Sequence, residues 1–193
     1  MTAILGWGSL LWDRSRNREF DSYHHPWLQE GPVLKLEFSR ISRSRAGALT
    51  LVIDPLSGSP CQVRYALSKR LSPKDAVCDL RTREDTTMEN IGWMFAERGE
   101  FHSKHPELKD EISAWARARR YDAVIWTDLE SNYERTLGRP FSAADAVAYL
   151  RALPPMGTAK AIEYVSKAAS SVRTPLRTLV EQESWFAQAA GGD

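Results

Sequence analysis

The chain opens with a short apolar run that two glycines stop at once. Ala3, Ile4 and Leu5 are followed directly by Gly6-Trp7-Gly8. Glycine adopts backbone angles that other residues resist, so this pattern predicts a buried strand that leads into a glycine loop. The loop, Gly6 to Leu11, is the first candidate for a binding site.

Hydrophobic patterning along the rest of the chain predicts an α+β fold. Apolar runs or strict alternation mark further strands at residues 34–38, 48–53, 63–67 and 123–126. Helix starts are indicated at Ser72-Pro73-Lys74-Asp75, at Pro106 and at Ser142-Ala143-Ala144-Asp145. Strands therefore come first and helices later, with one long helix between strands, which favours α+β over a regularly alternating parallel fold.

Length and charge narrow the class of protein. A chain of 193 residues with 42% hydrophobic residues suits one globular domain, and we predict a single domain over 1–193 in which 130–193 form a mostly helical C-terminal extension. The formal charge of +1 gives no electrostatic reason to expect nucleic acid or membrane as the partner. A small molecule is therefore the expected partner. We expect a cytoplasmic protein, because no signal-peptide pattern or long apolar stretch is found.

Consecutive backbone N–H groups in the glycine loop could cradle a carboxylate or a developing oxyanion. The loop lacks the third glycine of a dinucleotide fingerprint and the Gly-Lys-Ser/Thr of a phosphate loop. A purely structural tight turn is the alternative interpretation. A second candidate, Arg81-Thr82-Arg83-Glu84-Asp85, follows a helix predicted over 72–80, and its alternative is a solvated helix end.

Taken in order, these segments resemble the γ-glutamylcyclotransferase family, in the group that includes the AIG2-like and ChaC-type proteins. Trp7-Gly8-Ser9-Leu10 is similar to the family's aromatic-Gly-Ser-Leu loop, and Leu11-Trp12 extends the likeness to the ChaC-type form. A strand pair at Ala48 to Ile53 and Cys61 to Leu67 and an acid at Arg83-Glu84 continue it. The likeness covers about residues 3 to 90, and Trp7 stands where the family usually has tyrosine.

The resemblance implies a small mixed β-barrel-like sheet with surrounding helices, and cyclotransfer on a γ-glutamyl amine or peptide such as glutathione. The α-amine would attack its own γ-carbonyl and release 5-oxoproline, without cofactor or metal. Glu84 would be the base and then the acid, which requires burial that raises its pKa to about 6 to 7. The substrate-binding residues implied are those of the loop and one arginine: Gly6, Trp7, Gly8, Ser9, Leu10, Leu11 and Arg45.

Several alternatives stay open. Arg45 belongs to a cluster with Arg40 and Arg43 that either binds a substrate carboxylate or is simply solvated. Residues 130–193 could supply a lid, a homodimer surface or only added support. The rival to an enzyme is a non-catalytic small-molecule-binding or protein-interaction module on the same fold. We expect no metal site from the four histidines and no nucleophile among Cys61 and Cys78.

Overall fold

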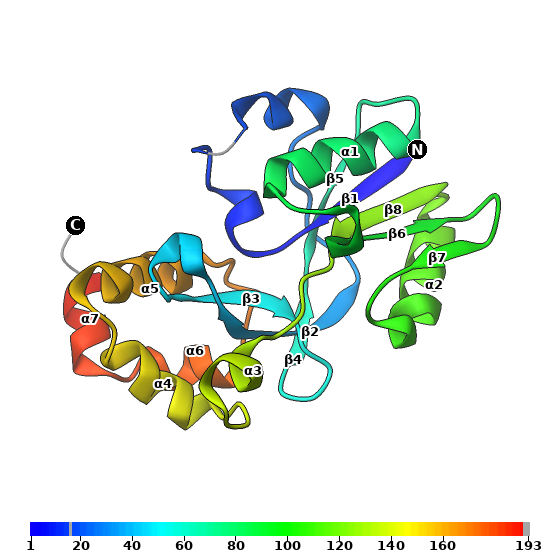
Figure 1. Ribbon diagram of the computed structural model, residues 1–193. Helices are drawn as coiled ribbons and strands as arrows, with labels where there is room; N and C mark the ends of the chain where they lie inside the picture. The colour runs from blue at the N-terminus through cyan, green and yellow to red at the C-terminus, as the bar shows by residue number, and fades with distance from the viewer. Residues whose placement is uncertain (16, 191–193) are drawn as a thin grey trace. The chain divides into compact units, whose positions relative to one another are not determined.

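The computed structural model describes residues 1–15 and 17–190, with side chains to residue 188 (Figure 1). Within it the chain forms two compact units, each made of two separate segments. Unit 1 contains Met1–Val33 and Gln62–Leu129, and unit 2 contains Leu34–Cys61 and the chain from Glu130 onward.

Unit 1 is built on a five-stranded mixed sheet in the order β5-β1-β8-β6-β7. β1 pairs in parallel with β8, whereas the β1–β5, β6–β8 and β6–β7 pairs are antiparallel. The apolar strands predicted near residues 3, 65 and 124 are confirmed, and the β6–β7 hairpin was not predicted. The strand bounds are β1 Thr2–Gly6, β5 Arg64–Leu67, β6 Ile91–Phe95, β7 Glu100–His102 and β8 Ala123–Thr127.

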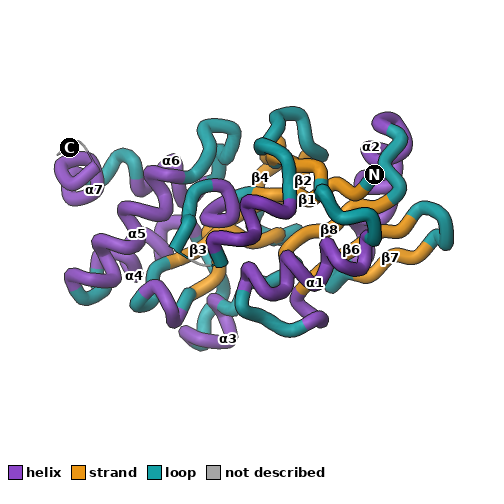
Figure 2. Tube along the Cα trace, turned by 90° about the horizontal axis from the view of Figure 1, so that it is seen from above, coloured by secondary structure: helices purple, strands orange, loops and turns teal. Residues whose placement is uncertain are grey.

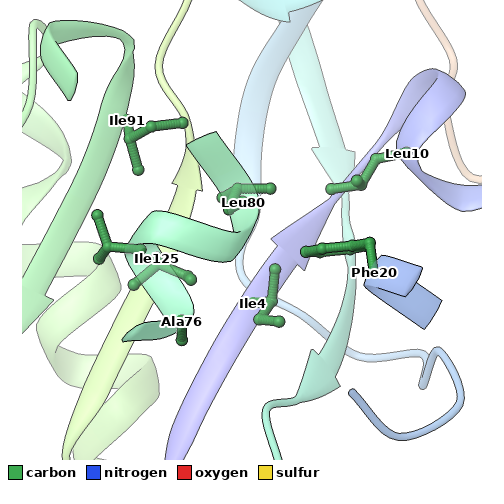
Figure 3. Close-up of a cluster of buried hydrophobic side chains, with 8 residues drawn as sticks. Ile4, Leu10, Phe20, Ala76, Leu80, Ile91 and Ile125 are labelled. Atoms are coloured by element: carbon green, nitrogen blue, oxygen red, sulfur yellow. The ribbon is translucent and has the colours of Figure 1, made fainter. Parts of the chain in front are cut away.

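Two helices, α1 (Pro73–Glu84) and α2 (Lys109–Arg119), cover opposite faces of this sheet (Figure 2). On the α1 face, Ile4 and Ile125 of the sheet meet Leu80 of the helix in a buried apolar cluster (Figure 3). The alternate strand residues face α2, because successive side chains of a strand point to opposite faces. Short helical turns complete the unit: η1 Gly8–Leu11, η2 Arg18–Tyr23, η4 Met88–Asn90 and η5 Pro106–Leu108.

Unit 2 combines a three-stranded sheet, in the order β3-β2-β4, with helices from the C-terminal third of the chain. The predicted start at Ser142 is confirmed, since its hydroxyl oxygen accepts the Asp145 N–H at 3.2 Å. Pro73 begins α1 as predicted, but the Ser72 side chain makes no capping bond there. The bounds are β2 Val33–Ile41, η3 Arg43–Arg45, β3 Leu49–Ile53, β4 Ser59–Gln62, α3 Tyr133–Leu137, α4 Ala143–Arg151, α5 Pro155–Lys167, α6 Pro175–Val180 and α7 Ser184–Ala190.

The α+β prediction is confirmed by these two sheets and their helices. The strands of residues 1–15 and 17–190 form open sheets, and no closed barrel is detected among them, in contrast to the predicted barrel-like sheet. In unit 1 the sheet stays open because its edge strands, β5 and β7, each pair with a single strand of the sheet. No helix in the described part of the chain is long and apolar enough to cross a membrane. The single-domain organisation stays a prediction.

Candidate functional site

The glycine loop lies at the end of β1 in unit 1, where the sequence predicted it. Trp7 is extended, and the chain then turns into η1 at Gly8, whose φ of +62° is a left-handed conformation that favours glycine. Leu10 points from this turn into the apolar cluster under α1. The loop is therefore held at both ends, by the strand before it and by the core beneath it.

Gly6 is needed for a close approach rather than for an unusual backbone angle. A Cβ atom at this position would lie 2.6 Å from the ring of Trp27, closer than real contacts allow. The Trp27 ring in turn packs beside His24, with ring centroids 5.1 Å apart. The first glycine of the loop thus accommodates an indole, and only the second makes the turn.

Glu84 is the last residue of α1, not a residue beyond the helix as the sequence suggested. The buried residues of α1 are Ala76, Val77, Leu80 and Arg83, which follow helical spacing. Glu84, four residues after Leu80, lies beside this stripe, and its side chain is 16% exposed. Asp85 then ends the helix in a left-handed conformation, with φ of +50°.

Arg83 connects the end of α1 to the glycine loop. Its side chain is 4% exposed, and its Nη1 lies 3.7 Å from Glu84 Oε1. Its Nη2 donates to the carbonyl oxygens of Asp13 at 2.6 Å and of Ser9 at 3.4 Å. One guanidinium therefore contacts both the predicted catalytic carboxylate and the predicted binding loop, which are more than 70 residues apart in sequence.

A polar network follows directly after this helix end. The Asn90 side-chain amide donates to Thr86 Oγ1 at 2.9 Å and accepts from Lys104 Nζ at 2.6 Å. The buried Asp128 carboxylate accepts from the Lys104 N–H at 2.6 Å and from the Trp126 indole N–H at 3.0 Å. These bonds attach the segment after Glu84 to the end of β8.

Arg45 lies in unit 2, on η3, whereas Glu84 and the loop lie in unit 1. Its guanidinium stacks over the Tyr164 ring at 5.1 Å, so at least part of its role is packing within unit 2. Arg40 of the same cluster donates to the Glu130 carbonyl oxygen at 2.7 Å. The role of Arg45 in substrate binding stays a prediction.

Comparison with known protein families, curated proteins and solved structures finds no match for this chain.

The arrangement in unit 1 combines one partly desolvated carboxylate with a turn whose first N–H groups have no acceptor inside the turn. Such a pair can move a proton and can stabilise negative charge on a carbonyl oxygen. Within residues 1–15 and 17–190, no three His, Cys, Asp or Glu side chains gather as metal ligands would.

Burial raises the pKa of the Cys61 thiol in unit 2.

Sequence reasoning assigned no role to Arg83, although a signal for it was present. The apolar residues Ala76, Val77 and Leu80 follow helical spacing in the sequence, and the next positions at this spacing are 83 and 84. Extending the helix by one turn would have predicted a buried Arg-Glu pair. An arginine at a buried helical position needs acceptors, and the loop carbonyls supply them.

Proposed function

We propose that this chain is a cyclotransferase with a γ-glutamylcyclotransferase-like architecture, acting on a γ-glutamyl amine or peptide. The observation that carries the proposal is the contact of Arg83 with both Glu84 and the Ser9 carbonyl. Arg83 thus contacts both Glu84, which the resemblance implies as the base, and the loop that the resemblance implies as the binding site.

In the proposed reaction the substrate is both nucleophile and electrophile. The substrate reacts as the free α-amine, and the Glu84 carboxylate accepts the proton that the amine nitrogen loses as it bonds to the γ-carbon. A bond forms between the amine nitrogen and the γ-carbon, and the tetrahedral intermediate collapses as the bond to the leaving nitrogen breaks. Glu84 returns the proton to that nitrogen, so 5-oxoproline and a free amine leave with no cofactor required.

The loop from Gly6 to Leu11 supplies donors in this mechanism. We assign the N–H groups of the η1 turn to the substrate carboxylate or to the oxyanion, since preorganised backbone donors stabilise developing charge without reorganising. Trp7, Ser9, Leu10 and Leu11 shape this cradle. The positive φ of Gly8 and the close approach of Trp27 to Gly6 support a fixed loop conformation.

Two opposing effects act on Glu84 in this proposal. Desolvation at the helix end favours the protonated acid, whereas the Arg83 guanidinium 3.7 Å away favours the carboxylate. A base that works near neutral pH requires desolvation to outweigh the effect of the guanidinium. The dependence of turnover on pH therefore reports directly on this pair.

The Arg83–Glu84 contact also favours a second candidate function. If Arg83 serves only to hold the loop, Glu84 is its structural counterion and the chain is a non-catalytic binding or interaction module. The two functions differ in a single measurement, which is the release of 5-oxoproline.

The test incubates the protein with glutathione and a panel of γ-glutamyl amines and peptides and measures 5-oxoproline. We expect turnover of at least one compound, and Glu84→Gln should lower it roughly 10²- to 10⁴-fold with little change in binding. Asp85→Asn is the matched control, because it removes the adjacent exposed carboxylate and asparagine tolerates the left-handed conformation. A folded protein that releases no 5-oxoproline from any compound would favour the binding module.

Arg45→Gln tests the carboxylate anchor separately. If Arg45 binds the substrate carboxylate, KM rises roughly tenfold or more while kcat changes little, because a charge-assisted contact is lost in ground and transition states alike. Arg43→Gln, an exposed neighbour in the same turn, is the control. Equal KM values for the two variants would remove Arg45 from the site.

A further inference from the structure

Unit 1 contains a cavity of about 480 Å³ on the face of the sheet that α2 covers. Its walls are the β6–β7 hairpin, α2 and the short segment that follows α2. Phe101 lies in the first wall, Arg117 in the second and Tyr121 in the third. α1, which carries Glu84, lies on the opposite face (Figure 2). The cavity is therefore separate from the candidate site, and nothing proposed for Glu84 bears on it.

Positive charge dominates the lining. Lys109, Arg117 and Arg120 all line the cavity, and the first two lie two turns apart on one side of α2. Among the described residues, none of the three has an acidic partner. Three cations thus face one cavity, although the chain as a whole is nearly neutral.

The two acids of the lining are already neutralised by other groups. Glu100 lies 3.7 Å from the Arg98 guanidinium, and Asp122 pairs with the N-terminal ammonium group. Neither acid is paired with a cation of the cavity lining. The site therefore carries an excess of positive charge that an anionic ligand would balance.

Apart from Ser113, the remaining walls are apolar or aromatic, and neighbouring side chains hold them in place. Phe101 packs against the fully buried Trp126, with ring centroids 5.7 Å apart, and Met94 lies opposite Phe101 in the strand register. Tyr121 donates to the Tyr65 hydroxyl at 3.4 Å, and burial raises the pKa of Tyr121 to about 12. A flat ring can pack on such a surface while a polar group remains among the cations.

We propose that this cavity binds a small organic anion that joins two or more negative charges to a flat aromatic ring, the chemistry of a nucleoside diphosphate. Arg117 and Arg120 hold the charged end, because guanidinium groups bind phosphate oxygens in pairs. Phe101 and Met94 contact the ring. The volume suits a ligand of this class.

Calorimetric titration of the whole protein with three probes tests the proposal: ADP, pyrophosphate and adenosine. ADP combines charge and ring, whereas the other two carry one feature each. We expect ADP to bind roughly tenfold or more tightly than either of the others, and its affinity to fall as salt is raised. No binding of ADP at about 1 mM, or equal affinity for ADP and adenosine, would overturn the proposal.

Variants locate the binding. The double variant Arg117→Gln/Arg120→Gln should weaken ADP binding roughly a hundredfold, since both side chains are exposed and the fold does not depend on their charges. Arg81→Gln, an exposed arginine at the other face of the same unit, should leave the affinity unchanged. Equal ADP affinity in the two variants would place the ligand elsewhere and overturn the assignment.

Discussion

The guanidinium of Arg83 donates a hydrogen bond of 2.6 Å to the carbonyl oxygen of Asp13. This single bond joins the last turn of α1 to the segment that directly follows the glycine loop, across 70 residues of sequence. Because the arginine is buried, the bond forms away from water, where an unpaired charge is strongly unfavourable. The geometry around Glu84 therefore depends on a residue that the proposed chemistry does not itself use.

Replacing Arg83 with methionine should destabilise unit 1. The substitution keeps an apolar stem but leaves the Asp13 and Ser9 carbonyls without their donor, and we expect the free energy of unfolding to fall by about 2 to 4 kcal/mol. Urea denaturation measures the change. Arg81→Met, on the exposed side of the same helix, is the control and should change stability by less than about 0.5 kcal/mol. Similar losses in both variants would contradict the buried role of Arg83.

Gly6→Ala should destabilise the protein through one specific clash. The new Cβ would meet the Trp27 ring at 2.6 Å, so the indole must move, at about 1 to 3 kcal/mol. The penalty should shrink when Trp27 is replaced by leucine, and a double-mutant cycle measures that coupling. Additive effects of the two substitutions would show that the close approach is not what selects glycine.

Stability should respond to pH through Glu37, a fully buried residue of β2. Burial raises the pKa of Glu37, and hydrogen bonds from Thr174 and from the Phe38 N–H offset this only in part. The folded state therefore holds this proton more tightly than the unfolded state. The stabilisation is complete below the unfolded pKa of about 4.3 and is lost as pH rises through the folded value.

The measurement compares Glu37→Gln with the parent protein over a pH series of urea denaturations. The variant should gain stability relative to the parent as pH rises above about 4.3. Glu163→Gln supplies a control of opposite sign, because hydrogen bonds from Lys167 and Lys160 lower the pKa of Glu163. Its stabilisation is present above the unfolded pKa and is lost as pH falls through the folded value. Parallel curves for both variants would refute the assignment.

Asp128→Leu should be more harmful than most single substitutions. It would leave the Ser103 hydroxyl, the Lys104 N–H and the Trp126 indole N–H without the acceptor they share. We expect a loss of about 3 kcal/mol or more and a changed emission spectrum from the buried indole. Asp110→Leu, on the exposed side of α2, is the reference and should have little effect on either signal.

Strands that contain short apolar runs could be predicted from the sequence. A strand that depends on close packing against a distant residue could not. β1 and β8 are such runs, and both were expected. β6 contains Gly92, although glycine normally weakens a strand. A Cβ atom at this position would lie 2.2 Å from the Trp126 indole. Glycine is therefore required by a partner residue more than 30 positions away in sequence. That partner cannot be read from the local sequence.

The same limit applies to the candidate site. The glycine loop and Glu84 could be selected as candidates because their residues form recognisable local patterns, and their functional role stays a prediction. The end of α1 was placed too early because Asp85, rather than glycine, adopts the left-handed conformation that ends the helix. Arg83 was missed because its acceptors lie far away in sequence.

The interleaved segments of the two units have a consequence for synthesis on the ribosome. Residues 34–61 carry the strands of unit 2, but the helices of that unit come only after residue 129. At cellular elongation rates this leaves the nascent β2, β3 and β4 waiting on the order of ten seconds for their helical cover. Unit 1, in contrast, is complete as soon as residue 129 has been made. Translation speed across the last two thirds of the message therefore sets how long an uncovered sheet is available to chaperones and to neighbouring chains.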